Sequence, residues 1–276
     1  MTAADTTVPG TLITVAPTGT DHAKSDVPNL PVTLAELVRT AQDCARVGAS
    51  VIHVHARGAD GKPTLDLGLL RETVATLREY TPLIVRLSTA GVAGDSEADR
   101  LRVLDALPDS ASCVLTDRWE FIVELHKRMA ETDIVPEYEI NDLGQLTSLR
   151  RLLDDYGLPA CGRVHVGLMH GASGGMPGTV EAVSAALREL PDGATFSASG
   201  IDQASVPVML TTLAARGHLR VGMADTIGYG NGEPARDNAQ LVARAAGLAR
   251  IAQRPPLPGE AARELLGVPP AVRHDG

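Results

Sequence analysis

The chain lacks three features that would each indicate a specialised class of protein. It has no excess of basic residues, since 34 acidic and 25 basic side chains give a formal charge of −9. It has no uninterrupted apolar run long enough to span a membrane. Its first residues, MTAADTTVPGT, do not form the basic start and apolar stretch of a signal peptide. The sequence thus argues against nucleic-acid, membrane and secretory functions and favours small-molecule ligands.

Cysteine is also scarce. The chain has three cysteines, Cys44, Cys113 and Cys161, and none of them belongs to a CxxC pair. An odd number without such spacing is typical of reduced thiols, not of a disulfide framework or a cysteine-based zinc site. We therefore predict a cytoplasmic protein whose cysteines pack in the core.

The sequence does contain a repeated alternation of short apolar runs and amphipathic stretches. Eight runs are candidate strands, at residues 11–16, 50–55, 82–88, 111–115, 134–140, 162–168, 194–199 and 217–223. Helical spacing appears at 33–49, 66–80, 179–190 and 206–217, and Thr33 with Glu36 predicts a capping box. The pattern predicts a (β/α)8 TIM barrel, with a doubly wound sheet as the alternative. We expect a single domain over residues 1–276, with loose ends at 1–10 and about 268–276.

Two histidines, His53 and His55, lie one residue apart in the second candidate strand, SVIHVH. Because side chains alternate along a strand, both rings point to the same face. By itself the pair is either half of a metal site or an incidental polar patch. The metal site is favoured because polar residues recur at the ends of other candidate strands, where a barrel carries its chemistry. These residues are Ser88, Thr89, Ser112, Glu137, Glu139 and Asp225.

Six segments of the chain carry a family resemblance between about residues 11 and 265. They are TVAPTGTDHAKSDVPNLPVT, GASVIHVHARGADGKPTLD, LSTAG, PEYEINDLG, GGMPGT and RVGMAD. In this order and spacing they resemble the β-keto acid cleavage enzymes, the family of 3-keto-5-aminohexanoate cleavage enzyme. The resemblance implies a metal-dependent barrel, usually with zinc, that converts a β-keto acid and acetyl-CoA into acetoacetate and a new acyl-CoA.

The resemblance also implies the metal-binding and catalytic residues. His53 and His55 fall on the two histidine ligands of the metal, which favours zinc as the cofactor. Arg220 and Asp225 fall on a pair that takes part in removing a proton from the carbon between the two carbonyls. Asp21 falls where the family has a glutamate near the metal and the substrate. The competing interpretations are a structural salt bridge for the pair and a turn residue for Asp21.

A second set of residues is implied in substrate binding. Ser88, with Thr89 and Gly91 after it, falls on the segment that holds the substrate carboxylate, and a plain turn is the alternative. Ser112 replaces a threonine of the family and keeps its hydroxyl. Glu139 shares one strand face with Glu137, and we expect one of the two to face the pocket; an exposed strand end is the alternative.

The chain departs from the family at Ala224, where a glutamate completes the protein ligands of the metal. A methyl group cannot coordinate, and two histidines alone bind a divalent ion weakly unless another carboxylate takes part. Asp225, Asp21 and Glu139 are the candidates. The segment at 116–133 is also shorter than in the family, which predicts a reshaped substrate pocket.

Two functions follow from these observations. The first is a Claisen-type acyltransferase acting on a β-keto acid and acetyl-CoA, expected to work as a homo-oligomer. The second is a catalytically weakened barrel that binds keto acids or their CoA esters without turnover, and it rests on Ala224 alone.

Overall fold

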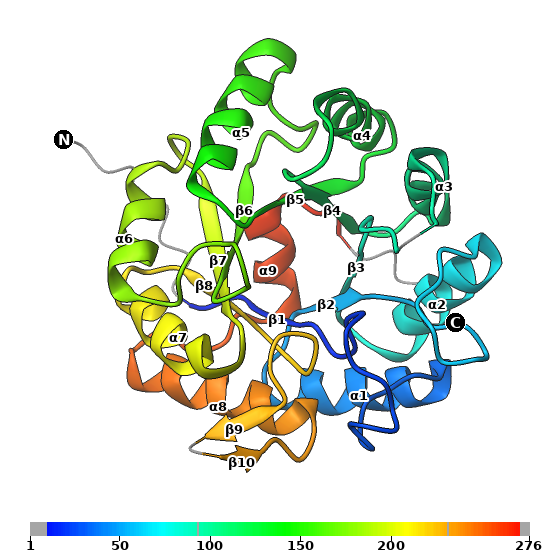
Figure 1. The fold of residues 1–276 in the computed structure, drawn as a ribbon, viewed down its shortest axis with the longest axis vertical. Helices are drawn as coiled ribbons and strands as arrows, with labels where there is room; N and C mark the ends of the chain where they lie inside the picture. Colours follow the sequence, from blue (N-terminus) through cyan, green and yellow to red (C-terminus); the bar gives the residue numbers. More distant parts are fainter. Residues whose placement is uncertain (1–9, 93, 231, 271–276) are drawn as a thin grey trace.

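Eight parallel strands close into a barrel in the computed structural model, which describes residues 10–92, 94–230 and 232–270 (Figure 1). The strands are β1 (Ile13–Val15), β2 (Val51–Val54), β3 (Ile84–Leu87), β4 (Ser110–Val114), β5 (Val135–Ile140), β6 (His165–His170), β7 (Thr195–Gly200) and β8 (His218–Val221). They pair in chain order, and β8 returns to pair with β1. The eight predicted strands and the TIM barrel are confirmed, and the alternative of an open, doubly wound sheet is wrong.

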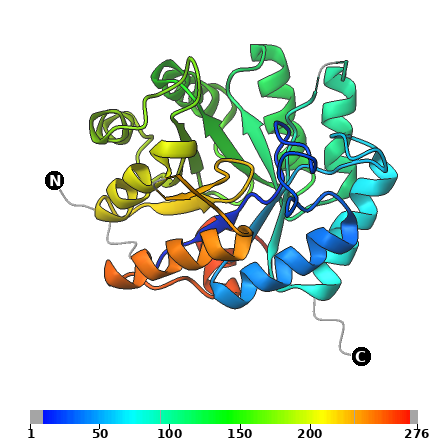
Figure 2. The same cartoon turned by 60° about the horizontal axis from the view of Figure 1, so that its bottom comes forward.

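Helices surround the barrel. They are α1 (Leu34–Val47), α2 (Leu67–Tyr80), α3 (Glu97–Arg102), α4 (Trp119–Glu131), α5 (Leu143–Tyr156), α6 (Val180–Arg188), α7 (Ser205–Ala214) and α8 (Asn238–Ile251), with the 3₁₀ turns η1 (Val103–Ala106) and η2 (Asp202–Ala204). The last of these helices, α8, packs beside α1 and closes the ring (Figures 1 and 2). In the part of the chain that the structure describes, no helix has the length and apolar character needed to cross a membrane.

The N-terminal end of the barrel is closed by a helix that the sequence patterns did not predict, α9 (Gly259–Leu266). It is seen through the centre of the barrel in Figure 1. Its buried side chains pack in one cluster with Leu12, just before β1, and with Val51, Ile84 and Val135 at the starts of β2, β3 and β5. The helix thus forms an apolar floor, and the chemistry is left to the opposite end of the barrel. A second unpredicted element is the short hairpin of β9 (Gly228–Gly230) and β10 (Glu233–Pro234) after β8.

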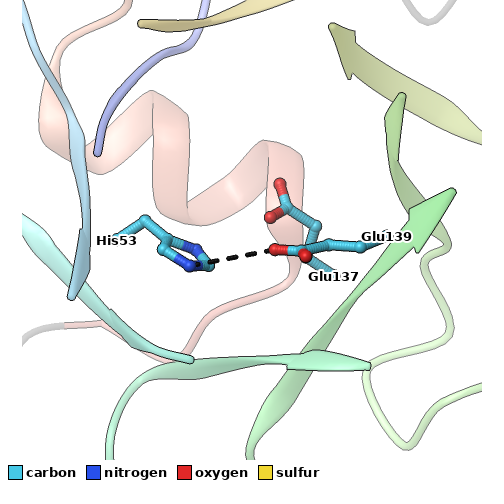
Figure 3. A group of neighbouring side chains, drawn as sticks. All are labelled: His53, Glu137 and Glu139. Carbon is cyan, nitrogen blue, oxygen red and sulfur yellow. Dashed lines mark ion pairs between the residues drawn. The ribbon is translucent and has the colours of Figure 1, made fainter. Parts of the chain in front are cut away.

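The barrel is apolar outside and polar inside above its floor. Along β2, Ile52 and Val54 pack in one cluster with α1 and α2, while His53 between them points inward (Figure 3). The same alternation in other strands places buried polar side chains inside the barrel. These are Arg86, Ser110, Ser112, Glu137, His165, Ser197, Ser199 and Arg220. Because the surrounding helices cover the outer face, the barrel interior is where the chain can hold charges away from water.

The structure also bears on the cysteines and the chain ends. Cys44 and Cys113 are fully buried, as predicted, and burial raises the pKa of both thiols. Cys161 is free but only partly buried, at the edge of the cluster around α9, so the prediction of a core position is wrong for it. Gly10 and Val268, at the inner limits of the two ends predicted to be loose, are buried. Residues 1–9 and 271–276, most of the two ends predicted to be loose, lie outside the described residues.

The predicted capping box at α1 is present and gives the fold a testable pH dependence. Thr33 accepts from the backbone of Glu36, whose carboxylate accepts from Thr33 N at 3.1 Å and from Lys24 Nζ at 2.5 Å. These bonds, that of Lys24 above all, lower the pKa of Glu36 from 4.5 to about 2. A carboxylate with a lowered folded-state pKa stabilises the fold above its unfolded pKa, and this effect is lost as the pH falls through the folded value.

We therefore expect Glu36→Gln to lower the free energy of unfolding. The difference from wild type should be full above pH 4.5 and should shrink between pH 4.5 and about 2. Urea denaturation of both proteins across this range measures it. Glu72→Gln, at an exposed position of α2, controls for the simple loss of a negative charge. A difference between wild type and Glu36→Gln that stays constant with pH would contradict the expectation.

Candidate active site

Polar side chains from four strands and one turn meet near the C-terminal end of the barrel. His53 comes from β2, Glu139 from β5, Ser199 from β7 and Arg220 from β8, while Asp225 lies in the turn after β8. All five are buried except Glu139, which keeps 13% of its side chain exposed. The parallel strands bring these residues to one place although up to 172 positions of sequence separate them.

Arg220 holds two carboxylates at once. Its Nε and Nη2 donate to the two oxygens of Asp225 at 3.1 and 3.0 Å, and its Nη1 donates to Glu139 Oε1 at 3.1 Å. Burial opposes the charge of Arg220, but Asp225 and Glu139 more than offset it and raise the pKa of the guanidinium. Arg220 is therefore a permanent cation whose planar group fixes the orientation of both acids.

A third hydrogen-bond donor and a rigid backbone turn hold Asp225 in place. Ser199 Oγ donates to its Oδ2 at 2.6 Å, so Oδ2 accepts from two donors and Oδ1 from one. The turn depends on Gly222, which has φ +149° and lies so close to β1 that a Cβ would meet the oxygen of Ala16 at 2.1 Å. Asp225 N donates to the carbonyl of Gly222 at 3.0 Å. The carboxylate is thus held in one position with a free lone pair on Oδ1.

His53 is buried, and His55 lies nearer the mouth of the barrel. The two ring centroids are 5.2 Å apart. His53 is 1% exposed, and neither of its ring nitrogens finds a hydrogen-bond partner within residues 10–92, 94–230 and 232–270. Burial, helped by nearby Arg220, lowers the pKa of His53 well below its usual value and that of His55 to about 4. Both rings are therefore neutral at pH 7, the form that binds metals.

Glu139 lies beside His53. Its Oε1 is 3.8 Å from His53 Nε2, which is too long for a hydrogen bond (Figure 3). Burial raises the pKa of Glu139, and Arg220 opposes this shift. Glu137 also points inward and is fully buried, so both carboxylates of the pair face the barrel interior. The alternative of an exposed strand end is wrong for both residues.

Glu137 belongs to a deeper polar layer that sequence reasoning missed. Arg86 Nη1 lies 2.5 Å from Glu137 Oε1, and Ser197 Oγ donates to the same oxygen at 3.4 Å. His165 Nε2 is 3.7 Å from it and 3.1 Å from Ser197 Oγ. Burial, with a contribution from Arg86, lowers the pKa of His165 to about 3. Two signals were available in the sequence: an arginine inside the apolar run PLIVRLS, and the alternating serines of ATFSAS.

The predicted carboxylate-binding segment after β3 is braced by β4. Thr89 N donates to Ser112 Oγ at 3.1 Å, and Thr89 Oγ1 donates to the Ser112 carbonyl at 2.7 Å. Gly91 leaves room for Arg100, since a Cβ there would meet the Arg100 side chain at 2.9 Å. Ser88 lines a small pocket together with His55, Thr20, Ala90 and Asp95. The structure thus brings Ser88 to the histidines, while Thr89 and Ser112 bond to each other.

Asp21 and Ala224 lie on the opposite rim. Asp21 is exposed, and its charge acts on His55 and Arg57. Arg57 Nη2 fastens this loop by donating to the carbonyls of Gly19 at 2.7 Å and His22 at 3.0 Å. Gly19, with φ +62°, lies so near Ala224 that a Cβ on it would be 2.9 Å from the Ala224 methyl group. The β1 loop is thus packed against the position where the family has its glutamate.

A metal ion fits the donor set on the inner side of His53. Ligand atoms of His53, Glu137 and Glu139 all lie within 4.8 Å of one another, and His55 is not part of this group. A neutral imidazole with two carboxylates is a donor set that divalent ions such as zinc bind.

Known proteins that are similar to this chain identify its family. The sequence profile of the β-keto acid cleavage enzymes matches residues 11–268. This chain belongs to the β-keto acid cleavage enzyme family. It is 29% identical over 269 residues to 3-keto-5-aminohexanoate cleavage enzyme of Acetoanaerobium sticklandii, covering 93% of this chain and 98% of that protein. It is 28% identical over 272 residues to 3-oxoadipate:acetyl-CoA acetyltransferase of Cupriavidus necator, covering 94% and 95%.

Among solved structures, ObcA in a ternary complex with a C4-CoA adduct and oxalate has a similar barrel. The TM-score is 0.74 at 16% identity, over 87% of this chain and 68% of ObcA. Apo ObcA gives 0.72 at the same identity, with 87% and 66% covered, so this chain spans about two thirds of the length of ObcA. At this identity the likeness concerns the fold alone.

Proposed function

We propose that this β-keto acid cleavage enzyme condenses a β-keto acid with acetyl-CoA and releases acetoacetate and a new acyl-CoA. The observation that carries the proposal is the Arg220 fork, which fixes Asp225 at the barrel mouth with one lone pair of Oδ1 free. The names of relatives support acetyl-CoA as the co-substrate. Besides the Cupriavidus necator protein, 3-dehydrocarnitine:acetyl-CoA trimethylamine transferase of Rhizobium meliloti is 28% identical over 267 residues.

Asp225 is the proposed base. Its free lone pair takes the proton from the carbon between the two carbonyls of the β-keto acid, and Arg220 keeps the carboxylate aimed during the transfer. The carbanion carbon then attacks the thioester carbonyl of acetyl-CoA, and the CoA thiolate leaves. The same thiolate attacks the original keto carbon of the condensed product, whose carbon–carbon bond breaks to give the new acyl-CoA and the carbanion of acetoacetate. This carbanion takes back the proton held by Asp225, which frees the carboxylate for the next turnover.

The other residues are proposed to bind and orient. A divalent metal, zinc by resemblance, held at the face of β2 that carries His53 and His55, supplies Lewis-acid polarisation of the keto oxygen. Ser88 lies in the pocket beside His55, where its hydroxyl can donate to the substrate carboxylate, with Thr89, Gly91 and Ser112 as the brace of that segment. Glu139 orients Arg220 from β5, and Asp21 lies at the outer rim of the same pocket region.

The test is product formation. Metal-loaded protein, acetyl-CoA and a panel of β-keto acids that differ in charge and length should yield acetoacetate and the matching acyl-CoA, detected by mass spectrometry. Acetyl-CoA labelled in the acetyl group should place its label in acetoacetate. Acyl-CoA formation that does not require acetyl-CoA would contradict the condensation.

A second candidate is a barrel that binds keto acids or CoA esters without turnover, favoured by the single observation that Ala224 replaces the metal-binding glutamate of the family. Saturable binding of these ligands with no product from any acid of the panel would support it. The reshaped pocket near α4, the cytoplasmic location, the single domain and the homo-oligomer stay predictions of the sequence.

A further inference from the structure

Three acceptor groups converge inside the barrel at the level of His53. One ligand atom each from His53, Glu137 and Glu139 lies within 4.8 Å of the other two (Figure 3). Around an ion bound at about 2.1 Å, ligand atoms are roughly 3–3.5 Å apart. Side-chain movements on the order of 1 Å would therefore bring these three atoms onto one ion. His53 and the two glutamates face each other across the barrel from β2 and β5.

Acceptor atoms of this cluster lack a partner inside the barrel. In the described part of the chain, the two ring nitrogens of His53 and Oε2 of Glu137 have no hydrogen-bond partner. Both side chains are at most 1% exposed. A buried acceptor without a donor costs about 1–3 kcal/mol. His53 carries one ring proton when neutral, so one of its two nitrogens is an acceptor, and Nε2 lies 3.8 Å from Glu139 Oε1. A single cation between them would satisfy all three groups.

The charges around the cluster leave room for this cation. Glu137 is paired with Arg86, and Glu139 and Asp225 share Arg220. Three carboxylates against two guanidinium groups leave one negative charge in a buried site. A divalent ion would turn this into one positive charge, which the carboxylate of a β-keto acid substrate neutralises. The cluster is therefore balanced when both the ion and the substrate are present.

Two observations separate His55 and position 224 from this cluster. His55 lines two small pockets at the rim, whereas His53 lines neither of them. At position 224 the methyl group of Ala224 lies against the β1 loop at Gly19. The outer side of the histidine pair thus borders two small pockets at the rim, and the inner side faces the carboxylates.

We propose that His53, Glu137 and Glu139 hold the divalent ion, with β5 supplying the carboxylate ligands that position 224 lacks, while His55 faces the substrate. The inference rests on the metal dependence proposed above and names the ligands of that site. If this is correct, Ala224 marks a change in which residues bind the metal, and the metal site itself is kept.

The test is Co²⁺ binding by the metal-free full-length protein, followed by visible absorption and by the rise in melting temperature. Wild type should bind one Co²⁺ per chain. His53→Ala and Glu139→Gln should each weaken binding on the order of 100-fold, because removing a ligand costs at least as much affinity as removing a residue that only hydrogen-bonds to a ligand. Glu137→Asp keeps a charge for Arg86 but withdraws the ligand, so it should fold and also bind weakly. His55→Ala should change the affinity by less than about 10-fold.

Asp117→Asn is the matched control, because Asp117 forms a two-bond pair with Arg100 at 2.8 and 2.6 Å away from the cluster. It should lose stability but keep Co²⁺ affinity; an equal loss of affinity in the control would overturn the inference. Wild-type affinity in both Glu139→Gln and Glu137→Asp, with tighter binding in Ala224→Glu, would overturn it while leaving the metal dependence intact. A wild type that binds neither Co²⁺ nor Zn²⁺ by elemental analysis would overturn the metal dependence itself.

Discussion

Asp225→Asn is expected to lower kcat by about 10²–10⁴-fold with little change in KM. Asparagine keeps the size of Asp225, and its amide oxygen can still accept from Ser199 Oγ and Arg220 Nε, but the amide nitrogen that takes the place of Oδ1 cannot take up a proton. Because the interaction is needed only when the proton moves, the loss should fall on turnover and not on substrate binding. Steady-state kinetics with the best β-keto acid of the panel measures this effect.

A purely structural role for Asp225 predicts another outcome. The pair with Arg220 would then contribute to stability alone, and Asp225→Asn would lower the melting temperature without changing the rate per folded molecule. Ser199→Ala serves as the control, because it removes one hydrogen bond of 2.6 Å to Asp225 and leaves the carboxylate in place. A hydrogen bond to a charged group contributes about 1.5–3 kcal/mol, so the control should lose stability and a smaller part of kcat.

Arg220→Met should abolish activity and lower the free energy of unfolding by about 3–5 kcal/mol. Methionine has a similar length, but it leaves the carboxylates of Asp225 and Glu139 inside the barrel without a counter-charge. Such a loss corresponds to a fall in melting temperature on the order of 10 °C for a domain of this size. Differential scanning calorimetry and urea titration give the two values.

Second variants identify the cause of the Arg220→Met effect. Adding Glu139→Gln should recover part of the lost stability, because it removes one of the two uncompensated charges; no recovery would show that packing, not charge, is responsible. Arg220→Lys should keep most of the stability and still lose turnover, since an ammonium group cannot hold Asp225 through two parallel bonds. Arg118→Met, which breaks an exposed pair with Glu97, should cost at most about 1 kcal/mol.

Local patterns in the sequence were sufficient to predict the eight-stranded barrel, although not α9 or the β9–β10 hairpin. Short apolar runs marked the eight strands, and helical spacing with a capping box marked α1 to within one or two residues. These features are encoded by neighbouring residues, because hydrogen bonding and side-chain direction within one element depend on local spacing. The same local rule placed His53 and His55 on one face of β2 and Asp225 just after β8.

The ligand environment of His53 was decided by the tertiary structure. The sequence left Asp225, Asp21 and Glu139 as candidates to replace the glutamate missing at Ala224. Barrel closure brings β5 across from β2 and places Glu139 3.8 Å from His53, in a group of possible ligands that includes Glu137 but not Asp225. Such contacts join residues 81 positions apart, as between Glu139 and Arg220. They follow from strand order and tilt around the whole barrel, which no local spacing encodes.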